Sequence, residues 1–409
     1  MTILASVNNK TLMAGITPIA DVPDAPTIGT VTVTNDTTVS VPFTAATTGG
    51  TPTSYIVTAT PSVGDISTNA GTTSPRTVTG TFVTDTAYTF KIRGVNSTAT
   101  GPESSASNSV TPLVTPPNTF VTIAYGTNSS ATSTNGADWT SRTMPSVRNW
   151  YALYYANGRF VTAGNGSTVG AYSEDGITWT TIAFSTAKAW SQTAFGNSRW
   201  VINGQNQPSA YAVSTNNGVS WSDATAGSGF AGSSSVFGNG VFVSAETTAN
   251  AGINAWYSSN GTSWTNGGSL GATAGWGRGY YNASGGGFII TANTSSNYVS
   301  QSTTGTGSWS LRTLPTTASW GGCMAYGNGV WSYLTNTAAA SSTDGITWTS
   351  RTTPAALGFV SMWYSASMNL FVAVAGSSGL AYTSSTGTGS WTSRTLPSTN
   401  EWYSVASTG

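Results

Sequence analysis

The chain has 409 residues, and its 13 Lys and Arg balance 13 Asp and Glu, so that charged residues are only 6% of the total. A neutral surface this poor in charge lacks the basic patch that phosphate binding requires, which argues against a nucleic-acid partner. The absence of His and the single Cys323 remove the commonest general base and exclude an intrachain disulfide, so we expect no metal site and no cofactor.

Residues 1–21 form a weakly apolar arm without a clear period. Asn8, Asn9, Lys10 and Thr11 interrupt its apolar residues, so it lacks the continuous apolar core of a secretory signal. No run elsewhere approaches the ~20 apolar residues that span a bilayer. We therefore expect a protein made in a host cytoplasm without membrane insertion. The arm is either a flexible terminus or an anchor that docks into a larger assembly.

Residues 22–112 alternate between short strands and polar turns, which predicts about seven strands in a two-sheet sandwich. This segment resembles a fibronectin type III domain in Pro23, Pro26, Ser54-Tyr55-x-Val57, Tyr88-x-Phe90-x-Ile92 and Asn96. Tyr88 matches the tyrosine-corner position, whereas Phe43 replaces the Trp of the family's second strand. The resemblance implies a spacer domain, followed by a proline-stiffened linker at 113–118.

From residue 119 to 409 one motif returns at a regular interval. Ser173–Trp179 recurs almost unchanged as Ser342–Trp348, and the repeats end at tryptophans 139, 179, 221, 264, 309, 348 and 391. A period of roughly 40–45 residues in strand-rich sequence is typical of a β-propeller with one four-stranded blade per repeat. The fold class we predict is therefore all-β, a sandwich followed by a seven-bladed propeller.

The two ends of the repeat region predict how the propeller closes. Phe120–Ile123 matches the second strand of a repeat, and 402–406 matches a first strand. We expect the C-terminal strand to complete the blade that begins at Thr119, which leaves no open sheet edge.

The Ser-x-Asp-Gly-x-Thr-Trp segments resemble the Asp-box of the BNR/sialidase-type repeat. The resemblance implies a structural role, in which the acidic or amide side chain and the Ser hydroxyl bond the turn's own backbone and Gly supplies a positive φ. The expected box residues are Asn135, Asp175, Asn217, Asn260 and Asp344. The fifth and seventh repeats lack the acid.

A second set of aromatic residues follows the box tryptophans by 9 to 12 positions: Trp150, Trp190, Phe230, Trp276, Trp320, Phe359 and Trp402. These rings either pack between neighbouring blades or line a surface that stacks on sugars. Irregular loops in the third and fourth repeats are a second place for binding. The candidate ligand-binding residues are Gln205, Asn206, Trp256 and Trp276.

We predict no catalytic residue. The sialidase family needs three converging arginines, but Arg142, Arg312, Arg351 and Arg394 occupy equivalent outer-strand positions that cannot converge. Nothing pairs the remaining carboxylates as a glycosidase requires.

The overall composition resembles bacteriophage fibre and decoration proteins. The expected function is a virion appendage on the outer surface of the particle. Its arm would contact other virion proteins, and its propeller would bind a host-surface glycan or protein. A homo-oligomer is expected, because multivalency strengthens weak contacts. The alternatives are a secreted or surface lectin-like protein and a glycoside hydrolase of sialidase-like fold.

Overall fold

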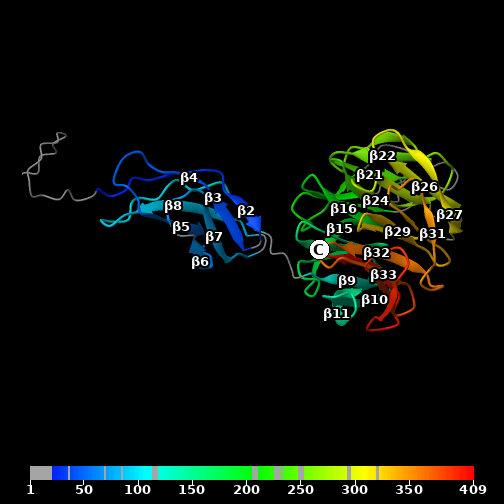
Figure 1. Ribbon diagram of the computed structural model, residues 1–409. Helices are drawn as coiled ribbons and strands as arrows, with labels where there is room; N and C mark the ends of the chain where they lie inside the picture. Colours follow the sequence, from blue (N-terminus) through cyan, green and yellow to red (C-terminus); the bar gives the residue numbers. More distant parts are fainter. Residues whose placement is uncertain are drawn as a thin grey trace, which may run out of the picture. The chain divides into compact units, whose positions relative to one another are not determined.

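The structure is a computed structural model that describes residues 21–35, 37–68, 71–83, 86–112, 118–204, 211–224, 232, 234–246, 253–292, 296–318 and 322–409. The chain divides into two compact units, Met1–Val114 and Thr115–Gly409 (Figure 1). Within the described ranges every element is a strand, and no helix could cross a membrane. The predicted arm, apart from Asp21, and positions 113–117 of the predicted linker lie outside these ranges.

In its described residues the first unit contains three small antiparallel sheets with the strand orders β2-β3-β7-β6, β5-β8 and β1-β4. Its strands are β1 (Thr27–Ile28), β2 (Thr32–Asn35), β3 (Thr38–Val41), β4 (Phe43–Thr44), β5 (Ser54–Thr60), β6 (Gly64–Thr68), β7 (Arg76–Thr81) and β8 (Thr89–Val95). Buried and exposed residues alternate along β7, as expected of a strand with one face on a core. The core includes Val39 and Val78 from the larger sheet and Val57 and Phe90 from β5 and β8, so both sheets bury their apolar faces in it.

Tyr88 lies in this core at the start of β8. Its hydroxyl oxygen accepts a hydrogen bond from the backbone N–H of Val83 at 3.0 Å, and its ring meets Phe82 edge-on with centroids 5.2 Å apart. A bond from the phenol back to upstream backbone is what a tyrosine corner requires. The resemblance to the fibronectin family otherwise stays a prediction.

The segment Ser107–Val110, at the end of this unit, lies beside β8 without forming a regular strand. The backbone N–H groups of Ser107 and Val110 still donate to Phe90 and Tyr88 of the β8 side. However, the hydroxyls of Ser104 and Ser107 accept from the N–H groups of Ile92 and Phe90. Serine side chains therefore replace the backbone acceptors that a continuous ladder would use.

The second unit contains seven four-stranded antiparallel sheets in its described residues. Three of them are formed by β12 (Trp150–Ala156), β13 (Arg159–Gly164), β14 (Ser167–Ser173) and β15 (Thr180–Lys188); by β16 (Trp190–Gly196), β17 (Arg199–Gly204), β18 (Tyr211–Ser214) and β19 (Ser222–Ala224); and by β20 (Val236–Gly238), β21 (Val241–Ala245), β22 (Asn254–Ser258) and β23 (Thr265–Ser269).

Three more sheets follow in chain order. They are formed by β24 (Trp276–Asn282), β25 (Gly287–Ala292), β26 (Ser296–Ser302) and β27 (Ser310–Ala318); by β28 (Cys323–Gly327), β29 (Val330–Leu334), β30 (Ala339–Ser342) and β31 (Thr349–Arg351); and by β32 (Phe359–Ser365), β33 (Leu370–Ala375), β34 (Leu380–Ser384) and β35 (Thr392–Thr395).

The seventh sheet joins the two ends of the second unit. It consists of β9 (Phe120–Ala124), β10 (Thr127–Ser133), β11 (Thr140–Arg148) and, from the other end of the sequence, β36 (Trp402–Ser407). The strand β36 pairs antiparallel with β9, with Ser407 opposite Phe120. The closure predicted from the sequence is therefore present.

Tight turns connect the first two strands of several sheets. At Asn157-Gly158 and Asn239-Gly240 both residues have positive φ, between 45° and 77°. This is the conformation of the two-residue hairpin turns that Asn-Gly favours, so the local sequence sets the hairpin register.

The sheets are held together by buried clusters between successive neighbours. One cluster packs Trp190 and Ile202 against Val161 of the preceding sheet. Another packs Val372 of β33 against Phe120 of β9, and so joins the sheet β32–β35 to the sheet that contains both chain ends of the second unit. Four-stranded sheets that pack side by side and return to their start form a β-propeller.

Candidate functional site

The box turns are built as the Asp-box resemblance implies. The Oδ1 atom of Asp175 accepts hydrogen bonds from the N–H groups of Ile177 and Thr178 at 2.8 and 2.7 Å and from the Ser173 hydroxyl at 2.9 Å. Burial raises the pKa of Asp175, but the bonds from Thr178, Ile177 and Ser173 lower it more, so the carboxyl titrates below its ordinary value. Asn135, Asn260 and Asp344 accept the same backbone bonds in their own turns.

The third repeat departs from the prediction, because the box acceptor is Asn216 and not Asn217. The Oδ1 atom of Asn216 accepts from Ser214 Oγ and from the N–H of Ser220. This repeat has one more residue between its Ser and its box Gly than the other repeats, so the residue that precedes Gly218 is displaced from the acceptor position.

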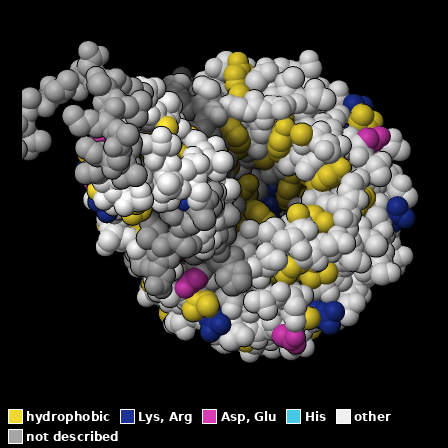
Figure 2. All heavy atoms as spheres, turned by 60° about the vertical axis from the view of Figure 1, so that its left-hand side comes forward, with side chains coloured by type: hydrophobic (Ala, Val, Ile, Leu, Met, Phe, Trp, Pro, Cys, Tyr) yellow, Lys and Arg dark blue, Asp and Glu magenta, His cyan; other side chains and the backbone are white. Residues whose placement is uncertain are grey.

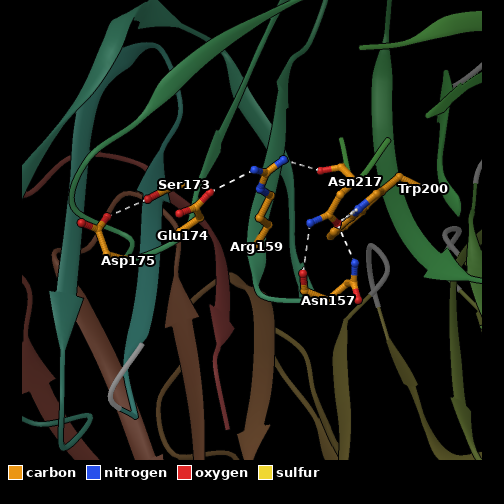
Figure 3. Close-up of polar contacts among 7 residues, drawn as sticks. All are labelled: Asn157, Arg159, Ser173, Glu174, Asp175, Trp200 and Asn217. Atoms are coloured by element: carbon orange, nitrogen blue, oxygen red, sulfur yellow. Dashed lines mark hydrogen bonds and ion pairs between the residues drawn. The ribbon is translucent and has the colours of Figure 1, made fainter. Parts of the chain in front are cut away.

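Asn217 instead bonds to the neighbouring sheet (Figure 3). Its side-chain oxygen accepts from Asn157 Nδ2 and Trp200 Nε1, and its carbonyl accepts from Arg159 Nη1 at 2.8 Å. Arg159 is only 2% exposed and also bonds Glu174 through Nη2 at 2.9 Å. The motif residues therefore hold neighbouring sheets together.

The predicted aromatic set lies inside the protein where the structure describes it. Trp150, Trp190 and Trp276 have no exposed surface, and Trp402 is 1% exposed. The indole N–H of Trp276 donates to the Ala272 carbonyl at 3.2 Å. This burial favours the packing alternative over sugar stacking. Phe230 and Trp320 lie outside the described residues.

Two of the four candidate ligand-binding residues, Trp256 and Trp276, lie in the part of the chain that the structure describes. Trp256 is half-buried on β22 and donates through Nε1 to Glu246 Oε1 at 2.7 Å, in a different cluster from Trp276. Gln205 and Asn206 lie outside the described residues. Ligand binding at these four positions stays a prediction.

A different site lies inside the ring of sheets. The first strands β12, β16, β20, β24, β28, β32 and β36 all contribute residues to the lining of a cavity of about 480 Å³. Figure 2 shows a central hollow in the second unit with hydrophobic side chains around it and a basic group at its floor. A volume in this range is typical of small-ligand pockets.

Arg278 is the basic residue of this lining, which contains no Asp or Glu among the described residues. Its Nη1 atom donates to the carbonyl of Val360, so the side chain reaches from β24 past β28 to β32. Beside it the hydroxyls of Tyr151 and Tyr403 are hydrogen-bonded to each other, and Gln192 Oε1 accepts from the N–H of Gly279 at 3.3 Å. Polar side chains from several sheets therefore meet around one guanidinium group.

The groups around Arg278 leave it charged and do not neutralise it. Burial lowers the pKa of Arg278, but the facing phenols of Tyr280, Tyr151 and Tyr403 and the Cys323 thiol raise it more. Burial in turn raises the pKa of Tyr280 to about 12 and moves that of Tyr151 further above its ordinary value. Near neutral pH the phenols of Tyr280 and Tyr151 are therefore uncharged and cannot serve as counter-ions.

The cavity wall also carries hydroxyl groups without a well-aligned hydrogen bond in the described structure. They belong to Tyr155, Thr193, Ser235 and Tyr280. Thr193 and Ser235 are 5% and 3% exposed, so bulk water reaches them poorly. Tyr280 lies near enough to Arg278 and the Met324 backbone for these groups to lower its pKa, although burial dominates. Buried polar groups are nearly always bonded, so four such hydroxyls around one cavity mark a polar binding surface.

Sequence reasoning missed this site, although one signal was present. Arg278 is the only charged residue in the seven strands that line the cavity. A charge in one innermost strand, at a position where the other repeats have none, departs from the repeat and is a reason to suspect function.

The described lining provides aromatic faces, hydroxyls and a cation, which are groups that bind. Burial raises the pKa of four lining tyrosines, Tyr151, Tyr154, Tyr155 and Tyr280, and makes them poor nucleophiles. Cys323 is buried, and this burial raises its pKa to about 12. Within the described residues no group of three or more Cys, Asp or Glu is placed to hold a metal ion.

Comparison with known proteins supports the fold class. No protein-family model matches the chain, and no curated protein matches it in sequence. A streptogramin B lyase structure is similar with a TM-score of 0.54 and 10% identity, over 71% of this chain and 91% of that one. A virginiamycin B lyase from Staphylococcus aureus is similar with a TM-score of 0.53 and 11% identity, over 62% of this chain and 87% of that one. For YCF48 from Cyanidioschyzon merolae the TM-score is 0.46 and the identity 14%, over 62% of this chain and 86% of that one.

The two lyase similarities, together with the four-stranded sheets described above, identify the chain as an all-β protein with a propeller of four-stranded sheets. At such low identity they show the fold alone, because one propeller scaffold carries many unrelated functions.

Proposed function

We propose that this protein is a virion appendage, a fibre or decoration protein of a bacteriophage, whose propeller binds a host-surface glycan in the axial cavity. The observation that carries the binding half of the proposal is the cavity itself. Aromatic rings and unpaired hydroxyls from different sheets face one volume of about 480 Å³.

A sugar fits the chemistry of this lining. Its apolar ring face suits aromatic side chains, and Tyr154, Tyr280 and Trp363 belong to the lining. Its hydroxyls can both donate to and accept from Thr193 and Ser235. A purely apolar ligand would leave these hydroxyls unpaired, at a cost of about 1–3 kcal/mol each.

The appendage half of the proposal is supported by the sequence. A chain with 6% charged residues and a single Cys323 resembles phage fibre and decoration proteins. In this reading the arm at 1–21 contacts other virion proteins, residues 22–112 are a fibronectin-type spacer, and 113–118 is the linker. Several copies on one particle would raise weak glycan binding by ~10²–10⁴. Antibodies against the chain should then label the outside of purified virions, and unlabelled virions would remove this half of the proposal.

An enzymatic role is the weaker alternative, although two of the similar structures are lyases. The S. aureus virginiamycin B lyase is described as catalytically inactive when a histidine is replaced by alanine. The present chain has no His, so it cannot reproduce a mechanism that needs one. A glycoside hydrolase would need paired carboxylates, and the described cavity lining has none. A secreted lectin-like protein would use the same cavity.

The variant Ala325→Trp tests glycan binding in the cavity. Ala325 on β28 is equivalent to Trp363 on β32. Each residue directly precedes a tyrosine that pairs with an aromatic residue of the next strand, Tyr326 with Trp331 and Tyr364 with Phe371. An indole there should fill the cavity and weaken binding at least tenfold, or ~1.4 kcal/mol. The measurement is a glycan array with the full chain, followed by calorimetric titration of the glycans retained.

The control is Val147→Trp, which places the same ring at a site that is 62% exposed and outside the cavity. It should bind like the original chain. The proposal fails if no glycan binds, or if folded Ala325→Trp, checked by its melting temperature, binds as tightly as the control.

A further inference from the structure

We infer that the ligand of the axial cavity carries a carboxylate that Arg278 binds, which makes an acidic sugar the ligand class. This inference rests on the proposed glycan-binding function and adds to it the charge of the ligand and the residue that selects it.

The first step is the unbalanced charge. The ion pairs among the described residues are Lys91–Glu103, Arg159–Glu174 and Lys188–Asp223, and none involves Arg278. Its guanidinium has five N–H donors, and the acceptors identified for it are the Val360 carbonyl and the Tyr280 hydroxyl, neither of which carries a negative charge near neutral pH. A cation removed from water costs free energy unless an anion or several acceptors compensate it.

The second step is that Arg278 does not belong to the structural repeat. Arg142, Arg351 and Arg394 each bond a Thr or Ser hydroxyl of the adjacent strand, as their shared sequence context implies. These arginines lie on outer strands and stabilise their own sheets. No other innermost strand has a charge where β24 has Arg278.

The third step is the surroundings of the guanidinium. The phenols of Tyr280, Tyr151 and Tyr403 lie around it, and burial keeps those of Tyr280 and Tyr151 uncharged near neutral pH. A bound anion therefore meets hydroxyl groups and no Asp or Glu of the described lining. The hydroxyls of Thr193 and Ser235, both at least nine-tenths buried, line the same volume and lack partners. They would form hydrogen bonds with the sugar hydroxyls while the carboxylate binds the Arg278 guanidinium.

The fourth step is the choice of anion. A planar guanidinium binds a planar carboxylate through two parallel N–H···O bonds, which adds orientation as well as charge. Phosphate and sulfate esters also accept such paired bonds, but a phosphate ester carries about −1.5 to −2 charges at pH 7, more than one guanidinium balances. The test therefore separates these three sources of charge.

The test compares matched ligands by calorimetric titration of the full chain. The probes are a hexuronate oligosaccharide, the same oligosaccharide reduced at its carboxyl groups, and its phosphate- and sulfate-bearing counterparts. We expect the uronate to bind at least tenfold more tightly than the reduced form. In Arg278→Gln this ratio should fall to about one, because the amide keeps hydrogen bonds and loses the charge.

Two further variants separate charge from stability. Arg278→Lys should keep part of the preference, because an ammonium group attracts the carboxylate without the two-bond geometry. The matched control Arg394→Gln removes a repeat arginine outside the cavity lining and should keep the full ratio. If Arg278→Gln melts too low to measure, the Lys variant decides.

The outcomes distinguish the two proposals. Equal binding of the uronate and its reduced form, unchanged in Arg278→Gln, overturns the carboxylate inference and leaves glycan binding standing. A preference for phosphate or sulfate overturns the choice of anion. If neither the acidic nor the neutral oligosaccharides bind, and the glycan array also retains none, glycan binding fails and this inference fails with it.

Discussion

At the residue scale, the box turns show one acceptor position filled by two chemistries. Asp175 and Asp344 place a carboxylate oxygen where Asn135 and Asn260 place an amide oxygen, and all four accept two backbone N–H bonds. The turn therefore requires the acceptor and not the charge. The charge adds a pH dependence, because the bonds strengthen when the acceptor is ionised.

The double variant Asp175→Asn/Asp344→Asn should reveal this pH dependence. Bonds from backbone N–H groups and Ser hydroxyls hold the pKa of both carboxyls below the ordinary value, against the opposing effect of burial. A carboxyl whose pKa is lower in the folded than in the unfolded state stabilises the fold at every pH above the unfolded pKa of about 3.9. This stabilisation is lost as the pH falls through the folded-state pKa.

Urea unfolding at pH 7, 4 and 2.5 checks this expectation. The original chain should be the more stable of the two at pH 7, and the difference should shrink toward zero at pH 2.5. Parallel stability curves across this range would show that the two carboxylates contribute no charge-dependent stability.

At the element scale, the contacts between sheets explain why the repeat is so regular. The aromatic near the end of an innermost strand pairs with the first aromatic of the next strand, as in Tyr155–Phe160 and Tyr364–Phe371, with centroids 4.6 and 4.7 Å apart. The same ring covers a glycine of the preceding sheet, so a Cβ at Gly327 would lie 2.2 Å from the ring of Tyr364. This glycine is required for close approach.

Arg159 provides a test of the polar contacts between sheets. It is buried, bonds Glu174 and the Asn217 carbonyl, and stacks over Tyr172 at 4.3 Å. Arg159→Ala should lower the free energy of unfolding by roughly 2–3 kcal/mol, since it leaves a buried carbonyl and a gap. Glu174→Gln keeps an acceptor on a partly exposed side chain and should cost less than about 1 kcal/mol.

Denaturant titration of both variants gives the comparison. A loss for Glu174→Gln as large as for Arg159→Ala would mean that the ion pair, and not the bond to the neighbouring sheet, carries the stability.

The sequence predicted the elements better than the site, for a physical reason. Strands and hairpin turns depend on local alternation and on Asn-Gly pairs, which are visible in any one repeat. The box acceptor of the third repeat was assigned to Asn217 because it precedes a glycine, and one extra residue shifted the role to Asn216. The cavity depends on seven strands converging, and Arg278 meets Val360, 82 residues away, so no local pattern reports it.

At the scale of the whole molecule, the sheets of the second unit close into a ring. Each sheet buries its faces against two neighbours, and β36 supplies the innermost strand of the sheet that β9 begins. Trp402 of β36 is 1% exposed and packs in the cluster between this sheet and the sheet that contains β33. Replacing a buried Trp by Ala costs about 3–5 kcal/mol, and removing the strand also exposes an unpaired edge.

A chain that ends at Glu401 should therefore fail to form the native propeller. We expect loss of the near-ultraviolet circular dichroism of the buried tryptophans and association through the open edge of β9 in size-exclusion chromatography. A synthetic peptide of residues 400–409 should restore the spectrum by pairing with β9, whereas the same peptide with Trp402→Ala should restore it at least tenfold less effectively, or ~1.4 kcal/mol. Retention of the original melting temperature by the truncated chain would show that the ring does not need its closing strand.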